Sequence, residues 1–398
     1  MGVTVPGMTE IGTDWRVVDG VPTAWFDSPS LIEGVALAGR IGELSAEVVV
    51  DLRATGVRVR LDSDEHIAAV SAAALDLGLA ANAAMLQDLG VVFESANPTG
   101  VRRFWQRVLD YAHGEHGGLV DPLRRDPAIR IRESTEPRPF RNRIHLDVVR
   151  PAAAVEKAGL GEAFGPYGVC HADSDGYEVD LVPGEALGEA LGITDWQAVF
   201  SAMACYRTTS PKQQRDLAAA AAALADGTDF PLLIDLRPGI VIIDSGKDQW
   251  DDDAHGLELD FNDLAGNIQT AARALGAAAD LGLTRFAQLV LDAADVDAVR
   301  AFWVAALGYA YDRRAGVTDI YDPRRLTPVL VFQELDASEI DRRRQRNRIH
   351  FELAVPSGLA QTRLATIVAA GGRLLDESKE RWRVADPEGN EVVIVSRA

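Results

Sequence analysis

Several classes of protein are excluded by what this 398-residue sequence has little of. It has only two cysteines, Cys170 and Cys205, too few for the disulfide framework of a small exported protein. No apolar run approaches the ~20 residues that a membrane-spanning helix needs. Residues 1–14 show neither the basic stretch nor the apolar stretch of a signal peptide. We therefore expect a soluble cytoplasmic protein that does not enter a membrane.

Positive charge is also scarce. The chain has 40 lysines and arginines against 60 aspartates and glutamates, a formal net charge of −20. Nucleic acids and anionic membranes are bound by clustered basic side chains, so neither is expected as a partner. The phosphate-binding P-loop, the glycine-rich dinucleotide motif and the Gly-x-Ser-x-Gly nucleophile motif are all missing. Hydrophobic residues make up 47% of the chain, which is enough to form buried cores.

What the sequence does contain is an internal duplication. Arg-Asn-Arg-Ile-His at 141–145 recurs at 346–350, and Phe-Trp at 104–105 recurs at 302–303. Asp-Leu-Arg at 51–53 recurs at 235–237, and Thr-Asp-Trp at 13–15 recurs at 194–196. Four matches in the same order indicate a repeat. Each half divides again, so we predict four domains, and we expect the two halves to pair within the molecule, with a homodimer as the alternative. The predicted domains are 1–85, 86–184, 185–283 and 284–398.

The front part of each half has the pattern of a small α+β layer. In the first copy, strands are predicted at 15–18 and 23–26, a helix at 31–44, two strands around an Ala-Thr-Gly turn and a helix at 66–79. This order, with Asp-Leu-Arg before the turn, resembles pterin-4a-carbinolamine dehydratase. Gly256-Leu257 followed by Leu264-Ala265 adds to the resemblance in the second copy. An unrelated α+β layer is the alternative.

The resemblance also implies that dehydratase activity is lost. The family carries a His-His-Pro run before the Asp-Leu-Arg strand, where this chain has Ala46-Glu47-Val48 and Phe230-Pro231-Leu232. The family's later histidine is also missing after the next strand of both copies. Imidazoles supply the proton transfers of that dehydration, and the replacing side chains cannot. We therefore predict two catalytically inactive copies of this layer.

The back part of each half has a β-α-β-β-β pattern. In the second copy, Asp295 opens a helix at 296–307 that ends at Gly308. Phe302-Trp303, the run 347–352 (Asn-Arg-Ile-His-Phe-Glu) and the turn 386–390 (Asp-Pro-Glu-Gly-Asn) resemble the vicinal oxygen chelate superfamily, which includes glyoxalases and bleomycin-resistance proteins. The first half keeps counterparts of all three. The fold predicted is α+β, a tandem duplication in which a dehydratase-like layer precedes a paired βαβββ barrel.

The resemblance also implies where ligands would lie. Metal-dependent members of the superfamily place one ligand on each of four strands, so that a divalent ion can chelate two substrate oxygens. Spacing maps these positions onto both barrels. They are Gly90, Ile131, His145 and Asp180 in the first, and Gln288, Phe332, His350 and Val393 in the second. Each barrel then keeps only two side chains able to ligate, too few for a tight metal site.

Two functions stay open from the sequence. In the first, the barrels bind a small apolar or aromatic molecule without transforming it, and no cofactor is needed. In the second, one barrel is a lyase, isomerase or ring-opening enzyme that uses His145 with Asp180, or His350 with Gln288, with or without a divalent metal. Because Asp180 is costly to bury unpaired and Val393 is apolar, we expect the first barrel to be better suited to a metal and the second to an apolar ligand.

Overall fold

A computed structural model describes residues 12–18, 20–45, 47, 49–114, 117–136, 138–188 and 192–397. The chain forms two compact units. Unit 1 consists of Met1–Leu86, Glu185–Thr284 and Arg397–Ala398, and unit 2 of Gln87–Gly184 and Arg285–Ser396. The breaks lie within one residue of the predicted boundaries, but the first and third segments share one unit and the second and fourth share the other. Separate folding of the four segments stays a prediction.

Unit 1 is built on one 11-stranded sheet that combines strands of both halves. Its strand order is β1-β2-β4-β3-β16-β17-β15-β14-β13, with β5 paired to β2 and β18 paired to β15. The strands are β1 (Trp15–Val18), β2 (Val21–Asp27), β3 (Val49–Arg53), β4 (Gly56–Arg60), β5 (Ala80–Ala81), β13 (Glu185–Gly188), β14 (Ile193–Ala198), β15 (Ala202–Arg207), β16 (Leu233–Arg237), β17 (Ile240–Asp244) and β18 (Ala278–Ala279).

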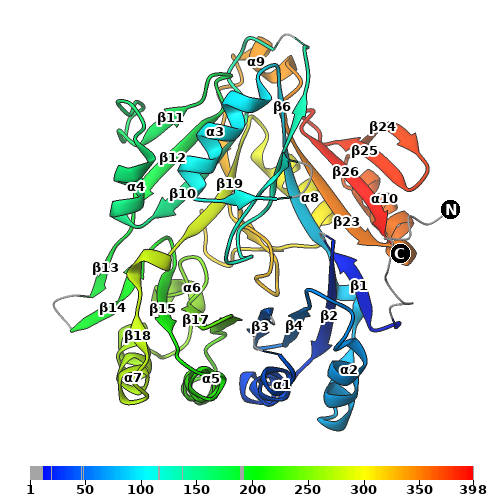
Figure 1. Ribbon diagram of the computed structural model, residues 1–398. Helices are drawn as coiled ribbons and strands as arrows, with labels where there is room; N and C mark the ends of the chain where they lie inside the picture. Colours follow the sequence, from blue (N-terminus) through cyan, green and yellow to red (C-terminus); the bar gives the residue numbers. More distant parts are fainter. Residues whose placement is uncertain are drawn as a thin grey trace. The chain divides into compact units, whose positions relative to one another are not determined.

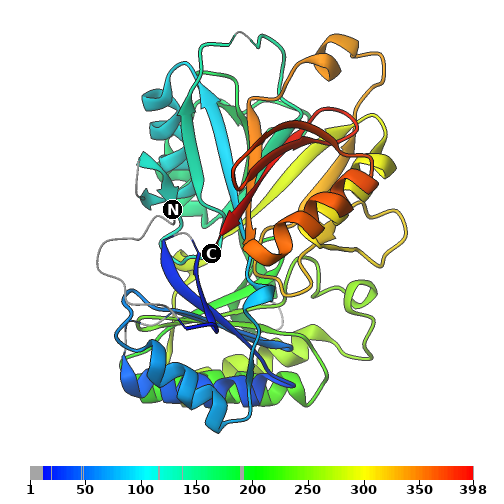
Figure 2. The same ribbon diagram turned by 90° about the vertical axis from the view of Figure 1, so that its right-hand side faces the viewer.

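Four helices lie along one face of this sheet (Figures 1 and 2). The hydroxyls of Ser30 and Ser210 accept a hydrogen bond from the third residue of the helix that follows, so both copies start α1 and α5 with the same cap. Alanines of α5 and aliphatic residues of α1 pack into one apolar core with the sheet. The helices are α1 (Leu31–Leu44), α2 (Ile67–Asp76), α5 (Pro211–Asp226) and α7 (Phe261–Ala274), with the short α6 (Asp252–His255), η1 (Ala83–Met85) and η4 (Leu281–Leu283).

The repeated Asp-Leu-Arg motif joins the two halves of the sheet. β3 pairs antiparallel with β16, and Asp51 lies opposite Asp235. Each arginine of the motif reaches the aspartate of the other copy: Arg53 Nη1 to Asp235 Oδ1 and Arg237 Nη2 to Asp51 Oδ1, both at 2.6 Å. Burial alone would raise the pKa of Asp51, but Arg237 and Arg58 outweigh it and hold that pKa well below its ordinary value. The motif therefore has a structural role. The resemblance of this layer to dehydratases stays a prediction.

Unit 2 contains two sheets, and each also combines strands of both halves. The first, named the His145 sheet, has the order β11-β12-β10-β19-β22-β21-β20, and the second, named the His350 sheet, has the order β24-β25-β26-β23-β6-β9-β8-β7. The strands are β6 (Asp88–Ser95), β7 (Ala112–His113), β8 (Leu119–Val120), β9 (Ile129–Glu133), β10 (Ile144–Arg150), β11 (Cys170–Ala172), β12 (Glu178–Pro183), β19 (Phe286–Ala293), β20 (Ala310–Tyr311), β21 (Ile320–Tyr321), β22 (Leu330–Glu334), β23 (Ile349–Pro356), β24 (Arg373–Ser378), β25 (Arg381–Ala385) and β26 (Glu391–Arg397).

This arrangement differs from the barrel predicted within each half. β10 of the first half pairs antiparallel with β19 of the second, and β6 of the first half pairs with β23 of the second (Figure 1). The described residues form two open sheets instead of one barrel in each half. Sequence pattern fixes which residues form a strand but not which neighbour a strand edge meets, so the exchange between halves was not foreseen.

The helices of unit 2 pack against one face of each sheet, and the described helices do not cover the opposite face. Trp105 on α3 and Trp303 on α8 are fully buried, and their Nε1 atoms donate to Asp173 (2.9 Å) and Asp386 (3.1 Å) of the two Asp-initiated turns. The tryptophans are therefore core residues that anchor these turns. The helices are α3 (Pro98–Leu109), α4 (Ala152–Ala158), α8 (Val296–Leu307), α9 (Ile340–Arg344) and α10 (Ala360–Ala369), with η5 (Ser357–Leu359).

None of the helices in the described part of the chain combines the length and the apolar character that crossing a bilayer requires. Residues 1–11, which the signal-peptide expectation concerns, lie outside the described residues.

Candidate functional site

The face of the His145 sheet that the helices leave uncovered brings three predicted site residues together. Asp147 on β10 lies opposite Asp180 on β12 and opposite Gln288 on β19. His145 lies two residues before Asp147 and so points to the same side of the sheet. The sequence had paired Gln288 with His350; the structure places it beside His145 and Asp180, because β19 pairs with β10 of the other half. Asp147 was missed, although its position two residues after His145 was a usable signal.

These side chains form a compact group of metal-ligating atoms. One ligand atom each from His145, Asp147 and Asp180 lies within 4.8 Å of the other two. His145 Nε2 is 3.5 Å from Asp147 Oδ1, and Gln288 Nε2 donates to Asp147 Oδ2 at 2.9 Å. An imidazole and two carboxylates are a mixed nitrogen and oxygen set that suits a divalent ion such as Mn²⁺ or Zn²⁺.

Two acceptors in this group are buried without a hydrogen bond. They are Oε1 of Gln288 and Oδ1 of Asp147. A buried acceptor that lacks a donor costs roughly 1–3 kcal/mol, so most are satisfied in folded proteins. A cation bound to such an oxygen would satisfy it. The residues present therefore fit a metal ion, and the two unpartnered oxygens are an observation independent of the clustering.

The electrostatics of the group favour a positive charge. Burial by itself lowers the pKa of His145, but its contact with Asp147 and the charges of Asp147, Asp292 and Asp180 raise it by more, so the net shift is upward. Cys170 lies opposite Asp180 on β11. Burial and its hydrogen bond to Asp180 raise the pKa of the Cys170 thiol to about 12. Near neutral pH the thiol is protonated, which argues against Cys170 as a nucleophile or thiolate ligand.

Phe332 is placed away from this group, which corrects its assignment as a ligand-binding residue. It lies opposite Leu291 on β19 and is buried in the core beneath the helices. Its neighbour Val331, opposite Val290, lies on the side of Gln288. The spacing used to map this position was therefore one residue out of phase, and a shift of one residue in a strand reverses the face.

The other two predicted residues, His350 and Val393, lie on the His350 sheet. His350 Nδ1 is 3.2 Å from Glu94 Oε1. Val393 is buried opposite Arg383 of β25. The surroundings are strongly charged: Glu352, two residues after His350, contacts three arginines, and Glu94 contacts two more. The sequence had predicted an apolar cavity around His350, with Gln288 beside it. The structure instead surrounds His350 with charged side chains and places Gln288 on the other sheet.

In unit 1, the positions of the lost dehydratase histidines are partly described. Phe230 and Leu232 are buried in the core, and the ring of Phe230 packs edge-on against His255 and at a tilt against Phe261. His255 is a buried imidazole that the sequence had not singled out, and its Nδ1 accepts a hydrogen bond from the backbone of Leu257 at 3.0 Å. In the first copy, Ala46 and Val48 lie outside the described residues. Absence of dehydratase activity stays a prediction.

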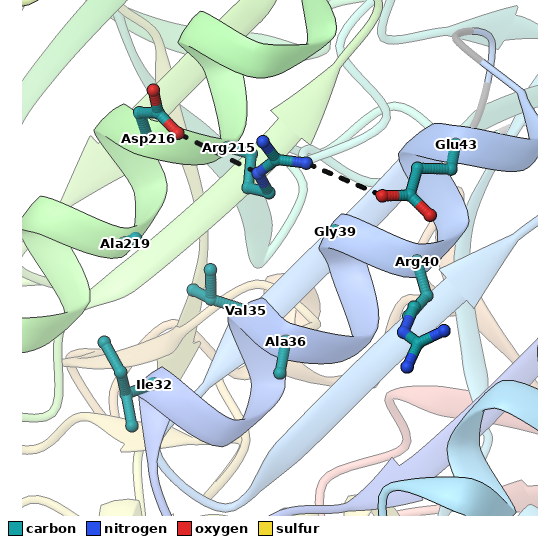
Figure 3. A pocket seen from close by; sticks show the side chains of 9 residues that line it. All are labelled: Ile32, Val35, Ala36, Gly39, Arg40, Glu43, Arg215, Asp216 and Ala219. Atoms are coloured by element: carbon teal, nitrogen blue, oxygen red, sulfur yellow. Dashed lines mark ion pairs between the residues drawn. The ribbon is translucent and has the colours of Figure 1, made fainter.

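An open groove of about 340 Å³ lies between α1 and α5 of unit 1 (Figure 3). Arg215 crosses it to within 3.8 Å of Glu43, and the missing side chain of Gly39 leaves room for the arginine stem. Arg215 pairs with Glu43 and Asp216 here, and all three side chains are exposed by 31% or more, so the groove is a weaker candidate for chemistry than the His145 sheet. The lining residues are Ile32, Val35, Ala36, Gly39, Arg40, Glu43, Arg215, Asp216 and Ala219.

Comparison with protein families identifies the fold of unit 2. Residues 90–163 and 288–395 match the family model of the glyoxalase-like domain. These segments form a glyoxalase-like domain of the vicinal oxygen chelate superfamily. The first matched segment contains His145 and ends before Asp180, and the second contains Gln288 and His350. No curated protein matches the sequence significantly.

Solved structures give distant similarities to the glyoxalase-like domain. Glyoxalase I from Zea mays is 9% identical with a TM-score of 0.38, and the alignment covers 78% of this chain and 92% of that one. A glyoxalase-related enzyme from Fulvimarina pelagi is 24% identical with a TM-score of 0.20, over 27% of this chain and 85% of that one. A glyoxalase/dioxygenase from Nostoc punctiforme is 18% identical with a TM-score of 0.22, over 27% and 88%. Scores this low support no functional argument.

Proposed function

We propose that the glyoxalase-like domain is a metal-dependent enzyme whose site is the uncovered face of the His145 sheet. The observation that carries the proposal is the placement of His145, Asp147 and Asp180 with ligand atoms within 4.8 Å of one another, next to the unpartnered Gln288 Oε1. His145 and Asp180 occupy positions that hold ligands in metal-dependent members of the superfamily, which the resemblance implies. Asp147 and Asp180 are two partly buried carboxylates close to each other, and a cation between them would offset their mutual repulsion.

In this proposal, each residue of the group has its own role. His145, Asp147 and Asp180 would hold the ion, which, when bound, supplies Lewis-acid stabilisation of an oxyanion on the substrate. Gln288 fixes the orientation of Asp147 through the 2.9 Å bond to Oδ2. The reaction class is that of a lyase, isomerase or ring-opening enzyme on a small molecule with two neighbouring oxygens.

Metal content tests the proposal. Purified protein incubated with Mn²⁺ or Zn²⁺ and then dialysed should retain about one ion per chain, measured by inductively coupled plasma mass spectrometry. His145→Ala should lose the ion. His350→Ala is the matched control, because it removes the corresponding imidazole from the other sheet. Absence of retained metal in the unaltered protein, or equal loss in both variants, would contradict the proposal.

Binding of a small molecule without turnover is the second candidate. The contact of Asp147 with His145 and its hydrogen bond from Gln288 partly satisfy the group without any ion, as a polar surface that binds a ligand directly would. In that case, Asp147→Asn should preserve ligand binding, whereas a metal site would be lost.

A further inference from the structure

An aromatic side chain continues the row of polar residues on the uncovered face of the His145 sheet. The loop that joins α4 to β11 places Phe164 opposite Cys170, with hydrogen bonds of 2.9 Å from Phe164 N to Cys170 O and 3.2 Å from Cys170 N to Phe164 O. Cys170 lies opposite Asp180, which in turn lies opposite Asp147. Residues opposite one another in a sheet point to the same face, so Phe164 lies at the edge of the face that carries the proposed metal site.

A contact of Cys170 supports this assignment of the face. Its Sγ atom lies 4.0 Å from Oε2 of Glu178. Glu178 is two residues before Asp180 on β12, so both carboxylates point to the same side of the strand. The thiol therefore points to the side of the carboxylates, and Phe164, which is opposite Cys170, shares that side.

The spacing along this row suits a small molecule. Neighbouring strands of a sheet lie about 4.8 Å apart, so the two steps from Asp180 to Phe164 span about 10 Å. The residue between them in the row is Cys170. Its thiol is uncharged near neutral pH, because burial and its acidic neighbours raise its pKa to about 12. A ligand can therefore place a polar end at the carboxylates, cross an uncharged side chain and place an apolar end against Phe164.

The loop leaves its aromatic side chains exposed. Phe164 is 49% exposed, and Tyr167 in the turn that follows is 84% exposed. A single exposed aromatic residue is common on protein surfaces and by itself indicates nothing. Here the local backbone explains its place: Gly165 and Gly168 adopt left-handed φ values of 80° and 64°, which glycine reaches without strain, and the chain reverses direction between them. This reversal returns the chain to β11 and brings Phe164 opposite Cys170.

We infer that Phe164 determines the specificity of the proposed metal site, by packing against an aromatic ring of the substrate. The substrate class is then a small aromatic compound that carries two neighbouring oxygens on the ring or on a short chain attached to it. Aromatic rings attract one another beyond the apolar area that they bury, so Phe164 favours a ring over an aliphatic group of similar size. This inference rests on the proposed function, because the ion holds the polar end of the substrate.

Two hydroxamates test the inference, because both present two neighbouring oxygens to a metal ion and differ only in the group attached. Acetohydroxamate carries a methyl group, and benzohydroxamate carries a phenyl ring. The full-length protein loaded with Mn²⁺ is titrated with each compound in a calorimeter. We expect benzohydroxamate to bind more tightly than acetohydroxamate. Phe164→Ala should weaken benzohydroxamate binding about tenfold and acetohydroxamate binding much less, whereas Phe164→Tyr, which keeps a ring, should retain the preference.

Tyr311→Ala is the matched control. Tyr311 lies on β20 at the other edge of the same sheet and is 47% exposed, close to the 49% of Phe164. It lies opposite buried Ile320, and Arg300 of α8 lies over its ring at 4.6 Å, so it is on the face that the helices cover. The control should leave the affinity for both hydroxamates unchanged.

The outcomes separate this inference from the proposed function. Equal affinity of the unaltered protein for the two hydroxamates, or no binding of either to protein that retains its ion, would overturn the inference. An equal loss of both affinities in Phe164→Ala, or the same loss in Tyr311→Ala, would also overturn it. A sample that retains no Mn²⁺ refutes the proposed function and the inference with it, and the metal content of each sample tells these failures apart.

Discussion

Replacing Asp51 with asparagine should destabilise unit 1 strongly, because Asp51 is the carboxylate that two buried arginines share across the junction of the halves. Arg237 Nη2 lies 2.6 Å from Oδ1 and Arg58 Nε lies 2.5 Å from Oδ2. Asp51 is fully buried, and the two arginine side chains are 3% and 6% exposed. Removing one partner of a buried ion pair leaves uncompensated charge and costs roughly 3–5 kcal/mol. We expect a loss of that order in the free energy of unfolding.

The assay is urea denaturation followed by circular dichroism, with Asp280→Asn as the matched control. Asp280 pairs with Arg207 at the same 2.6 Å, but the two side chains are 28% and 58% exposed. An exposed pair contributes about 0–1 kcal/mol, so the control should change little. If Asp51→Asn costs no more than Asp280→Asn, burial of the junction does not stabilise the sheet and the reasoning is wrong.

The pH dependence gives a second measure of the same pair. Because the folded-state pKa of Asp51 is well below its ordinary value of 3.8, ionised Asp51 stabilises the fold above that value. This contribution should fall as the pH drops below 3.8, and unaltered protein should approach the stability of Asp51→Asn in acid.

Three other predictions concern unit 2. Because the folded-state pKa of His145 is raised above 6.5, its proton stabilises the fold below that pH, and this stabilisation is lost as the pH rises through the raised value. The metal ion of the proposed site competes with this proton, so metal affinity should increase with pH over the same range. Titration with Mn²⁺ between about pH 5.5 and about pH 8.5 measures the effect. Gln288→Glu adds a carboxylate beside Asp147, so it should tighten metal binding in the same titration and lower the stability of the metal-free protein. Weaker metal binding in this variant would show that the ion does not bind beside Asp147. Trp105→Phe removes the 2.9 Å hydrogen bond to buried Asp173 and should cost roughly 1–3 kcal/mol in urea denaturation, and a neutral effect would show that the bond does not anchor the turn.

Much of the local structure could be predicted from the sequence. The helix expected at 296–307 is α8, and its ends carry the expected caps: Asp295 Oδ1 accepts from Ala298 N at 3.0 Å, and Gly308 adopts a left-handed φ of 68°. Caps and helical periodicity depend on residues a few positions apart, so one sequence suffices to read them. Short strands such as β11 (Cys170–Ala172) and β24 (Arg373–Ser378) were not foreseen, because they are held by their neighbours rather than by their own pattern.

The recurring motifs, the helix ends and the residue types of the candidate sites were thus determined by the sequence alone. Tertiary structure decided which of those residues meet. Pairing of β10 with β19 brings Gln288 to Asp147 and His145, and pairing of β6 with β23 brings Gly90 to Glu352. Strand edges present the same backbone groups whichever half they come from, so the choice of partner depends on the packing of the whole unit. For that reason the metal-ligating group and the charged surroundings of His350 became visible only in the folded chain.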